Sequence, residues 1–267
     1  MSRFMEVCEK AARAGGAVLM DWLGRVHVRE KGRSDLVTEA DLASQDMVRR
    51  VILEAFPDHF VLGEEDAPDA ATTPPSTSEY RWIVDPLDGT TNYVHQVPHF
   101  SVSVALERAG DLLVGTVYHP TANQCFTAEA GRGAYLNGAR LKTSEVTDLS
   151  RAVCAVGFPP QVTMDSPDLR LFLAGLDRCQ SFRRTGSAAL NLCYVAAGWY
   201  DVAWSFSTKV WDMAAGALLI REAGGVVTSP ESETLLLRDG HFFAAANKTL
   251  HEQILTMARE TAAQHPL

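Results

Sequence analysis

Residues 82–92 have the sequence Trp82-Ile83-Val84-Asp85-Pro86-Leu87-Asp88-Gly89-Thr90-Thr91-Asn92. The first three residues are apolar and favour β structure, so they predict an interior strand. Proline lacks a backbone donor and fixes its own φ, so we expect the strand to stop near Asp85. Glycine adopts conformations that other residues resist, so a tight polar turn should follow at Gly89. The stretch therefore predicts a buried strand that delivers two carboxylates, Asp85 and Asp88, to a turn.

These two carboxylates allow two interpretations of the turn. If they converge, they and the Leu87 carbonyl offer three oxygen ligands to a hard cation such as Mg²⁺, which prefers an octahedral oxygen shell. If they do not converge, Asp88 and Thr90 only bond nearby backbone amides, as in an ordinary capped turn. The stretch by itself leaves both interpretations open.

On either side of this stretch, helical and strand patterns alternate along the chain. Helical spacing of apolar residues runs from Phe4 to Leu23, where Gly15 and Gly16 indicate a close packing contact. Helices are predicted over 4–23, 41–56, 167–178, 187–197, 212–223 and 248–263. Strands are predicted over 26–28, 60–62, 82–85, 101–106, 112–117, 124–128, 152–156, 201–204 and 242–245. Residues 134–141 contain Asn137-Gly138, which is typical of a type I′ hairpin, and 67–78 should form a surface loop. The pattern indicates a mixed α and β protein with helices layered on sheets.

The bulk composition excludes several classes of protein. The 267 residues are 46% hydrophobic and 21% charged, as in ordinary globular proteins. We find neither a secretory leader pattern nor an apolar run of the roughly 18 residues that a bilayer span needs. The five cysteines are scattered, which favours reduced thiols in a cytoplasmic protein. The net charge of -9 argues against nucleic acid as a partner. We therefore expect a cytoplasmic protein without a membrane or nucleic-acid partner.

Three further segments place acidic side chains at the ends of predicted elements. Glu64 and Glu65 follow a strand, and adjacent residues there point in different directions, so only one should face a shared site. Asp212 lies at a helix start, where it could be a simple N-cap or a metal ligand, since a capping carboxylate has lone pairs to spare. Asp41 also lies at a helix start, and a plain N-cap is the favoured interpretation for it.

Together these acidic segments resemble the inositol monophosphatase family, within the wider group of lithium-sensitive, Mg²⁺-dependent phosphatases. The resemblance extends over most of the chain between about Lys31 and Gly225 and depends on five motifs. They are Asp35-Leu36-Val37-Thr38 with Asp41, Gly63-Glu64-Glu65, the run 85–92, Arg184-x-Gly186-Ser187-Ala188-Ala189, and Trp211-Asp212-x-Ala214-Ala215-Gly216. It implies an α+β fold, a layered α/β/α/β/α sandwich of the inositol monophosphatase and sugar phosphatase type. We expect a single domain over 1–267, with a metal-binding half over roughly 1–150 and an α/β half over 151–267.

The resemblance also implies a role for each motif residue. Glu64, Asp85 and the Leu87 carbonyl would hold a first Mg²⁺, and Asp85, Asp88 and Asp212 a second. A third, weaker ion would lie near Glu64, so two to three ions are expected, with Mn²⁺ as a possible substitute. Thr90, oriented by Asp41, would help Glu64 to position and deprotonate the attacking water. Asp88, Gly89 and Thr90 would hold the phosphate, and Gly186, Ser187 and Ala188 would line the rest of the substrate.

Two positions depart from the pattern of inositol-specific members. These members carry an acidic residue seven positions before the aspartate of the Trp-Asp motif, and this chain has Ser205 there. Loss of such a partner costs about 1–3 kcal/mol in binding. Lys209 adds a positive charge near the same wall; it could be a solvated surface lysine, or it could contact a second anionic group on the substrate.

The sequence therefore predicts an Mg²⁺-dependent phosphomonoesterase that hydrolyses a small polyol or sugar phosphate, such as inositol monophosphate. The alternatives are the same chemistry on histidinol phosphate, fructose 1,6-bisphosphate or a 3′-phosphoadenosine nucleotide, and a non-catalytic regulatory member of the fold. Because all four carboxylates of the ligand set are present, the catalytic interpretation is favoured over the regulatory one. The resemblance also implies a homodimer and inhibition by Li⁺.

Overall fold

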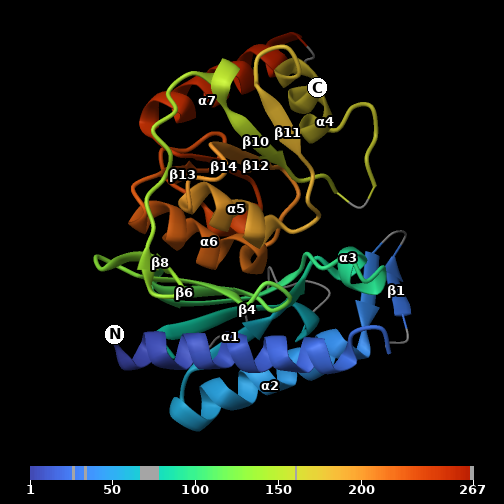
Figure 1. Ribbon diagram of the computed structural model, residues 1–267, viewed down its shortest axis with the longest axis vertical. Helices are drawn as coiled ribbons and strands as arrows, with labels where there is room; N and C mark the ends of the chain where they lie inside the picture. Colours follow the sequence, from blue (N-terminus) through green and yellow to red (C-terminus); the bar gives the residue numbers. More distant parts are fainter. Residues whose placement is uncertain (26–27, 33–34, 67–77, 160, 265–267) are drawn as a thin grey trace.

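The structure, a computed structural model, describes residues 1–25, 28–32, 35–66, 78–159 and 161–264. Helices and sheets alternate in five layers, with the N-terminal helices at one end and the C-terminal helix at the other (Figure 1). The α-helices of the described residues are α1 (Arg3–Trp22), α2 (Glu39–Ala55), α3 (Thr90–Val94), α4 (Pro167–Gly175), α5 (Ala188–Ala196), α6 (Val210–Glu222) and α7 (Lys248–Gln264). Within the described ranges, every helix is too short or too polar to traverse a lipid bilayer.

A seven-stranded sheet forms the layer next to the N-terminal helices. Its order is β3-β4-β5-β6-β7-β8-β9, with β3 and β4 parallel and the other neighbours antiparallel. These strands are β3 (Phe60–Gly63), β4 (Tyr80–Asp88), β5 (Ser101–Arg108), β6 (Asp111–His119), β7 (Gln124–Glu129), β8 (Gly133–Leu136) and β9 (Ala139–Arg140). Helices α1 and α2 cover one face of this sheet, and α5 and α6 cover the other (Figure 1). The site described below lies on β4.

A five-stranded sheet forms the fourth layer, and a small hairpin stands apart from both sheets. The sheet order is β11-β10-β12-β14-β13, and α4 and α7 cover its outer face (Figure 1). Its strands are β10 (Val153–Val156), β11 (Ser181–Arg183), β12 (Val202–Ser205), β13 (Val226–Thr228) and β14 (Phe242–Ala245). The hairpin pairs β1 (Val28–Gly32) with β2 (Asp35–Thr38). Because α5 and α6 lie between the two sheets, the central core is shared by both.

The α+β class and the α/β/α/β/α layering are confirmed. Two local predictions are confirmed as well. A side chain at Gly15 would come within 2.8 Å of Val48 and one at Gly16 within 2.5 Å of Tyr118, so these glycines allow α1 to pack closely. Asn137 and Gly138 both have positive φ, of 47° and 84°, as the type I′ hairpin requires.

The strand end at Asp85 was predicted wrongly. β4 continues to Asp88, and its register against β5 shifts between the two aspartates: Asp85 lies opposite Ser103, and Asp88 opposite Ser101. Three positions on β4 thus match two on β5, which is a β-bulge that takes up the extra residue at Pro86-Leu87. In a regular strand, residues three apart point to opposite faces. The bulge therefore brings both carboxylates to the same face of the sheet.

Other boundaries differ by a few residues. Asp41 and Asp212 are not N-caps: they occupy the third helical position, and Thr38 and Lys209 precede their helices as the capping residues. Helix α4 ends at Gly175, before the predicted residue 178. The sequence did not predict β2, β11 and β13, which are only three or four residues long. Residues 26–27 of a predicted strand and 67–77 of the predicted loop lie outside the described residues.

Candidate active site

Asp85 is surrounded by three carboxylates from different parts of the chain, and together they are called the Asp85 group: Asp85, Glu64, Asp88 and Asp212. Asp85 is 1% exposed, and its Oδ1 accepts a hydrogen bond from the Leu87 amide at 3.0 Å. Burial raises the pKa of Asp85 well above its usual value, and the charges of Glu64, Asp88 and Asp212 raise it further. Asp85 is therefore surrounded by negative charge that a cation would neutralise.

Asp88 has very different surroundings. Four donors point at its carboxylate: the Ser101 hydroxyl (3.1 Å), the Ser187 hydroxyl, and the amides of Ala188 (3.0 Å) and Ala189 (3.1 Å). Burial raises the pKa of Asp88, and these hydrogen bonds oppose that shift. Because the last three donors belong to the start of α5, Asp88 compensates the unpaired amides and the positive dipole end of that helix. The predicted substrate residues Ser187 and Ala188 thus contact Asp88 directly.

The two adjacent glutamates act on different partners. Glu64, Glu65 and Asp66 form a short 3₁₀ helix after β3, held to α2 by hydrogen bonds from Gln45 to Asp66 and from the Glu65 amide to Gln45. The charge of Glu64 acts on Asp85, and the charge of Glu65 acts on Asp41. The structure therefore brings Glu64 to the Asp85 group and directs Glu65 to the neighbouring carboxylate.

Asp212 reaches this group from the first turn of α6. Its Oδ2 accepts a hydrogen bond from the Lys209 amide at 2.7 Å, and its side chain is hydrogen-bonded to Asp85. Burial and the charge of Asp88 raise the pKa of Asp212 to about 7, while the Lys209 charge lowers it slightly. Lys209 is exposed, as expected of a surface lysine, yet it is close enough to act on Asp212.

Asp41 and Thr90 lie side by side at the edge of the group. The Thr90 hydroxyl is 3.1 Å from the Leu87 carbonyl and 3.5 Å from Asp41 Oδ1. The sequence predicted a Leu87 carbonyl that is free to bind a cation. Instead, this carbonyl accepts a hydrogen bond from Thr90, and it keeps a second lone pair. Asp41 Oδ2 accepts from the amide and the hydroxyl of Thr38, and burial raises the pKa of Asp41 to about 6.

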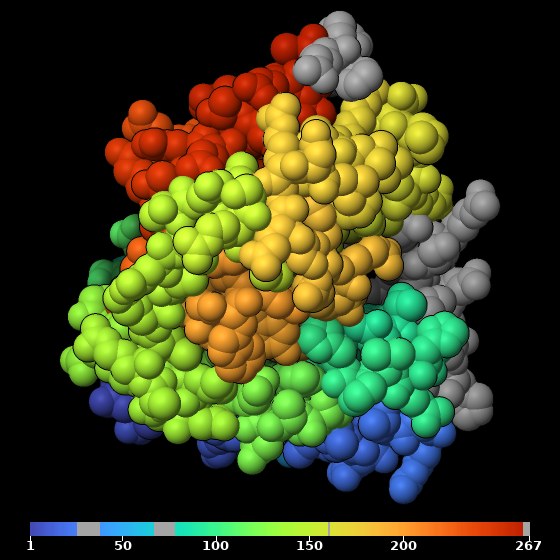
Figure 2. Space-filling view, turned by 45° about the horizontal axis from the view of Figure 1, so that its top comes forward, coloured from blue at the N-terminus to red at the C-terminus, as the bar shows by residue number. Residues whose placement is uncertain are grey.

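At Gly89 the chain that leaves β4 packs against the segment before α5. Gly89 has φ of +98°, and a side chain there would lie 3.2 Å from the His99 carbonyl and 3.3 Å from the Gly186 carbonyl. Asn92, on α3, donates to the carbonyls of His99 (2.7 Å) and Thr185 (2.8 Å). In Figure 2 the teal surface of α3 abuts the gold and orange surface that leads into α5. Only glycine fits this turn, which brings Gly186 against the end of β4.

Ser205 ends β12 and is 2% exposed. Its hydroxyl accepts from the Ser207 amide at 3.3 Å, and a side chain at Gly157 would lie 2.8 Å from it. The Ser205 side chain is therefore packed into its own loop. The role that the sequence assigned to it, contact with substrate, stays a prediction.

The sequence did not predict several serines that donate hydrogen bonds to the site. Ser101 donates to Asp88, Ser103 donates to the Trp211 carbonyl, and Ser44 donates to the Pro86 carbonyl. The alternation of serine and valine after Ser101 contained a signal, because it places both hydroxyls on one face of β5, opposite the aspartates. Ser44 gave no signal, since its contact spans 42 positions of the chain.

The donor set suits a hard cation. Asp85, Asp88, Asp212, Glu64 and the Leu87 carbonyl offer only oxygen atoms, which suit Mg²⁺ and other hard cations better than softer metals. Among the described residues, no three His, Cys, Asp or Glu side chains already have the spacing of a metal-binding group.

Comparison with known proteins agrees with the geometry. The family model described as "Inositol monophosphatase family" matches residues 1–263. The chain belongs to the inositol monophosphatase family. It is 40% identical to the "Fructose-1,6-bisphosphatase/inositol-1-monophosphatase" of Aquifex aeolicus over 97% of both chains, and 38% identical to the "Nus factor SuhB" of Pseudomonas aeruginosa over 96% of both. A solved structure of the extragenic suppressor protein suhB from Bartonella henselae superposes with a TM-score of 0.89 at 35% identity, covering 97% of this chain and 99% of that one.

Membership of the inositol monophosphatase family supports a phosphatase that acts on a phosphorylated small molecule. The relatives carry different functional names, so membership alone does not select the substrate.

Proposed function

We propose that the protein is an Mg²⁺-dependent phosphomonoesterase acting on a small polyol or sugar phosphate, such as inositol monophosphate. The observation that carries the proposal is the Asp85 group, in which carboxylates from the 3₁₀ helix after β3, from β4 and from α6 act on one buried aspartate. Burying like charges together destabilises a fold unless protons or a bound cation neutralise them. Mg²⁺ bound there would neutralise phosphate charge and lower the pKa of the attacking water.

The residues around this group would perform the remaining tasks. Thr90 can hold a water through its hydroxyl, and Asp41 Oδ1, 3.5 Å from that hydroxyl, can receive a proton relayed through it. Glu64 would orient the same water from the 3₁₀ helix. Glycine at position 89 lets the backbone approach the phosphate closely. Phosphoryl transfer needs mainly such positioning and charge neutralisation.

A phosphate panel tests the proposal. Release of inorganic phosphate would be measured from inositol monophosphate, fructose 1,6-bisphosphate, histidinol phosphate, a 3′-phosphoadenosine nucleotide and a generic aryl phosphate. Each reaction would be run with Mg²⁺, with Mn²⁺, with EDTA and with added Li⁺. We expect Mg²⁺-dependent turnover that Li⁺ inhibits. An inositol phosphate rate no better than the aryl phosphate rate would exclude inositol as the substrate, and no turnover on any compound would exclude the phosphatase.

We propose a Nus-factor role as the second candidate, because the Pseudomonas aeruginosa relative carries that name. Complementation of a bacterium that lacks its SuhB-type Nus factor would test it, with the wild-type chain and with Asp85→Asn. Equal complementation by both would assign a role that is independent of catalysis. Failure of both would leave phosphatase activity as the only proposed function. The homodimer and the cytoplasmic location stay predictions, which light scattering and cell fractionation can test.

A further inference from the structure

Helix α2 presents one face to two separate parts of the candidate active site. Ser44 and Gln45 follow Asp41 by three and four positions, so the three side chains lie on the same side of the helix, and all three are buried. Asp41 Oδ1 lies 3.5 Å from the Thr90 hydroxyl, and the Ser44 hydroxyl donates to the Pro86 carbonyl at 2.9 Å. One part of this face therefore contacts β4 and the turn that follows it.

Gln45 connects the same face of α2 to the segment that carries Glu64. Its Nε2 donates to Asp66 Oδ1 at 3.1 Å, and its Oε1 accepts from the Glu65 amide at 2.9 Å. A side chain at Gly63 would come within 2.1 Å of that Oε1, so the glycine leaves room for the amide group of Gln45. Gln45 is buried and therefore holds the two residues that follow Glu64.

Asp66 adds two further contacts to this connection. Its Oδ2 accepts from the Gly63 amide at 2.9 Å and is paired with Arg49, which lies one turn after Gln45 on α2. A 3₁₀ helix of three residues has little stability of its own. The place of residues 64–66 therefore depends on their contacts with α2.

The pairing of β3 with β4 brings Glu64 beside Asp85. Gly63 lies opposite Val84 in this parallel pair, so the residues that follow them, Glu64 and Asp85, come side by side, and the charge of Glu64 acts on Asp85. Mg²⁺ demands near-ideal octahedral geometry with its oxygen ligands at about 2.0–2.1 Å. A small displacement of Glu64 would therefore weaken a Mg²⁺ site that includes both carboxylates.

We propose that Gln45 is a positioning residue for Mg²⁺ binding, which acts through the two residues after Glu64 to hold that carboxylate beside Asp85. This inference rests on the proposed function, because it assigns Glu64 to the Mg²⁺ site. Since α2 contacts the turn after β4 with the same face, this helix sets the spacing between the two halves of the site.

Mg²⁺ binding to the intact chain, measured by isothermal titration calorimetry without substrate, tests the proposal. Gln45→Ala should bind Mg²⁺ about tenfold more weakly than the wild type, because residues that hold a metal ligand in place contribute to metal affinity on this scale. Hydrogen exchange of the Glu65 amide, followed by NMR, should become faster in the same variant, since the acceptor is lost. Unchanged Mg²⁺ affinity or unchanged exchange would overturn the proposal.

An exchange of donor and acceptor provides the rescue. In the double variant Gln45→Glu with Asp66→Asn, the carboxylate at position 45 accepts from the Glu65 amide and from the side-chain NH₂ at position 66. Both hydrogen bonds return with the same net charge, so most of the Mg²⁺ affinity should be restored. Gln45→Glu alone should stay weak, because two carboxylates would then face each other. Failure of the double variant to exceed Gln45→Glu would overturn the proposal.

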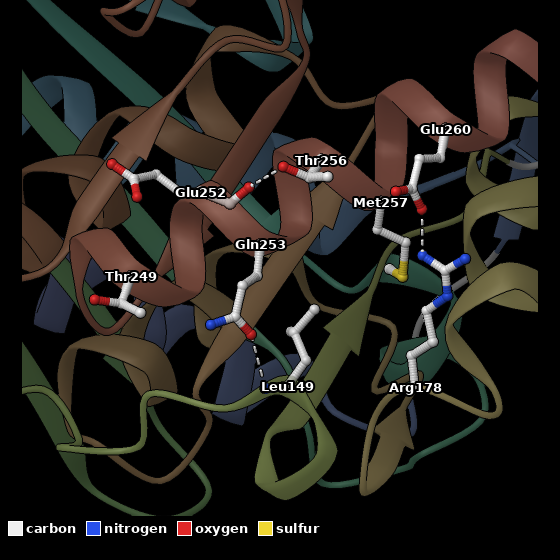
Figure 3. Close-up of a pocket in the computed structure, with 8 residues that line it drawn as sticks. All are labelled: Leu149, Arg178, Thr249, Glu252, Gln253, Thr256, Met257 and Glu260. Carbon is white, nitrogen blue, oxygen red and sulfur yellow. Dashed lines mark hydrogen bonds and ion pairs between the residues drawn. The ribbon is translucent and has the colours of Figure 1, made fainter.

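Gln253 offers a matched control in the outermost helical layer. Its Oε1 accepts from the Leu149 amide at 3.1 Å, as Figure 3 shows, and its Nε2 donates to the Thr147 carbonyl at 2.8 Å. Gln253→Ala thus removes the same two kinds of hydrogen bond from a helix as Gln45→Ala. Both variants should lower the thermal midpoint in EDTA, but Gln253→Ala should keep the wild-type Mg²⁺ affinity. An equal loss of Mg²⁺ affinity in both would reduce Gln45 to a general structural residue.

Phosphate release separates this inference from the proposed function. A wild type that binds Mg²⁺ but releases no phosphate from the panel would exclude the phosphatase and leave the role of Gln45 standing. A wild type that releases phosphate, with equal Mg²⁺ affinity in Gln45→Ala, would overturn the role of Gln45 alone. A wild type that binds no Mg²⁺ would overturn both.

Discussion

Asp85 and Asp88 lie three positions apart on one bulged strand and yet serve opposite purposes. Asp85 faces other carboxylates and accepts a hydrogen bond from the Leu87 amide, and its burial as a charged group is destabilising without a cation. Asp88 faces four donors, three of which belong to the start of α5. Its hydrogen bonds therefore join β4 to α5. Two identical side chains in one motif can therefore have different roles: Asp85 supplies negative charge for a cation, and Asp88 stabilises the contact between β4 and α5.

The largest expected effect separates these two aspartates. Asp85→Asn should reduce Mg²⁺-dependent phosphate release by at least about a thousandfold, because the proposed Mg²⁺ site would lose a carboxylate ligand. Its thermal midpoint without metal should stay equal or rise, since one buried charge is removed from a like-charged group. Turnover assays and thermal unfolding in EDTA would measure both effects. Near wild-type turnover would show that the metal assignment is wrong.

Asp88→Asn should reduce activity to a similar extent, and it should also lower the free energy of unfolding by about 1–3 kcal/mol. The loss of stability is expected because the side-chain NH₂ of asparagine cannot accept hydrogen bonds from the donors that face it. The variant should still fold. Urea unfolding of the two variants side by side measures the contrast. Equal stability changes in both would break the comparison.

The next expected effect is a change in Mg²⁺ affinity with pH. The pKa of Asp85 is raised and that of Asp212 is raised to about 7, so protons compete with Mg²⁺ as the pH falls. The apparent Mg²⁺ dissociation constant should therefore increase about tenfold for each proton displaced per pH unit below 7. Without metal the sign reverses: raised carboxyl pKa values give stability at pH below about 4 that is lost as the pH rises towards 7. Mg²⁺ titrations and EDTA melting curves between pH 5 and 8 test both halves; pH-independent Mg²⁺ affinity would contradict the shared site.

Ser187→Ala tests the contact between Asp88 and the start of α5. It removes one donor to Asp88 and the N-cap of α5, whose hydroxyl accepts from the Leu190 amide at 3.2 Å. We expect a loss of about 1–2 kcal/mol in unfolding free energy. Turnover should fall severalfold, since Asp88 is no longer held. Ser187→Thr keeps the hydroxyl and should restore most of both; failure of this rescue would argue against the capping contact.

Lys209→Ala should give the smallest effect. The side chain is exposed and lowers the pKa of Asp212 only slightly, so stability should change by less than about 0.5 kcal/mol. If Lys209 contacts a second anionic group of the substrate, KM should increase severalfold for bisphosphates and stay constant for monophosphates. An equal change in KM for both classes would make Lys209 a general electrostatic residue.

The candidate site was partly predictable because its chemistry is local. Asp85, Leu87, Asp88, Gly89 and Thr90 are adjacent in the chain, so one turn contains most of the proposed ligands. The faces of these side chains were not predictable: the proline suggested that β4 ends, and only pairing with β5 reveals the bulge that aligns both aspartates. The capping residues were missed for the same reason, since Thr38 and Lys209 precede their helices in an extended conformation that the helical pattern does not mark.

The sequence by itself determined the layered α+β class, most helices and strands, and the acidic set that resembles a phosphatase, because periodicity and short-range chemistry are written in neighbouring residues. The tertiary structure alone decided that Asp88 holds the start of α5 and that Asn92 joins α3 to the segment before α5. These contacts join residues between 93 and 101 positions apart in the chain. No periodic pattern encodes such distances; they follow only from how the sheets and helices pack.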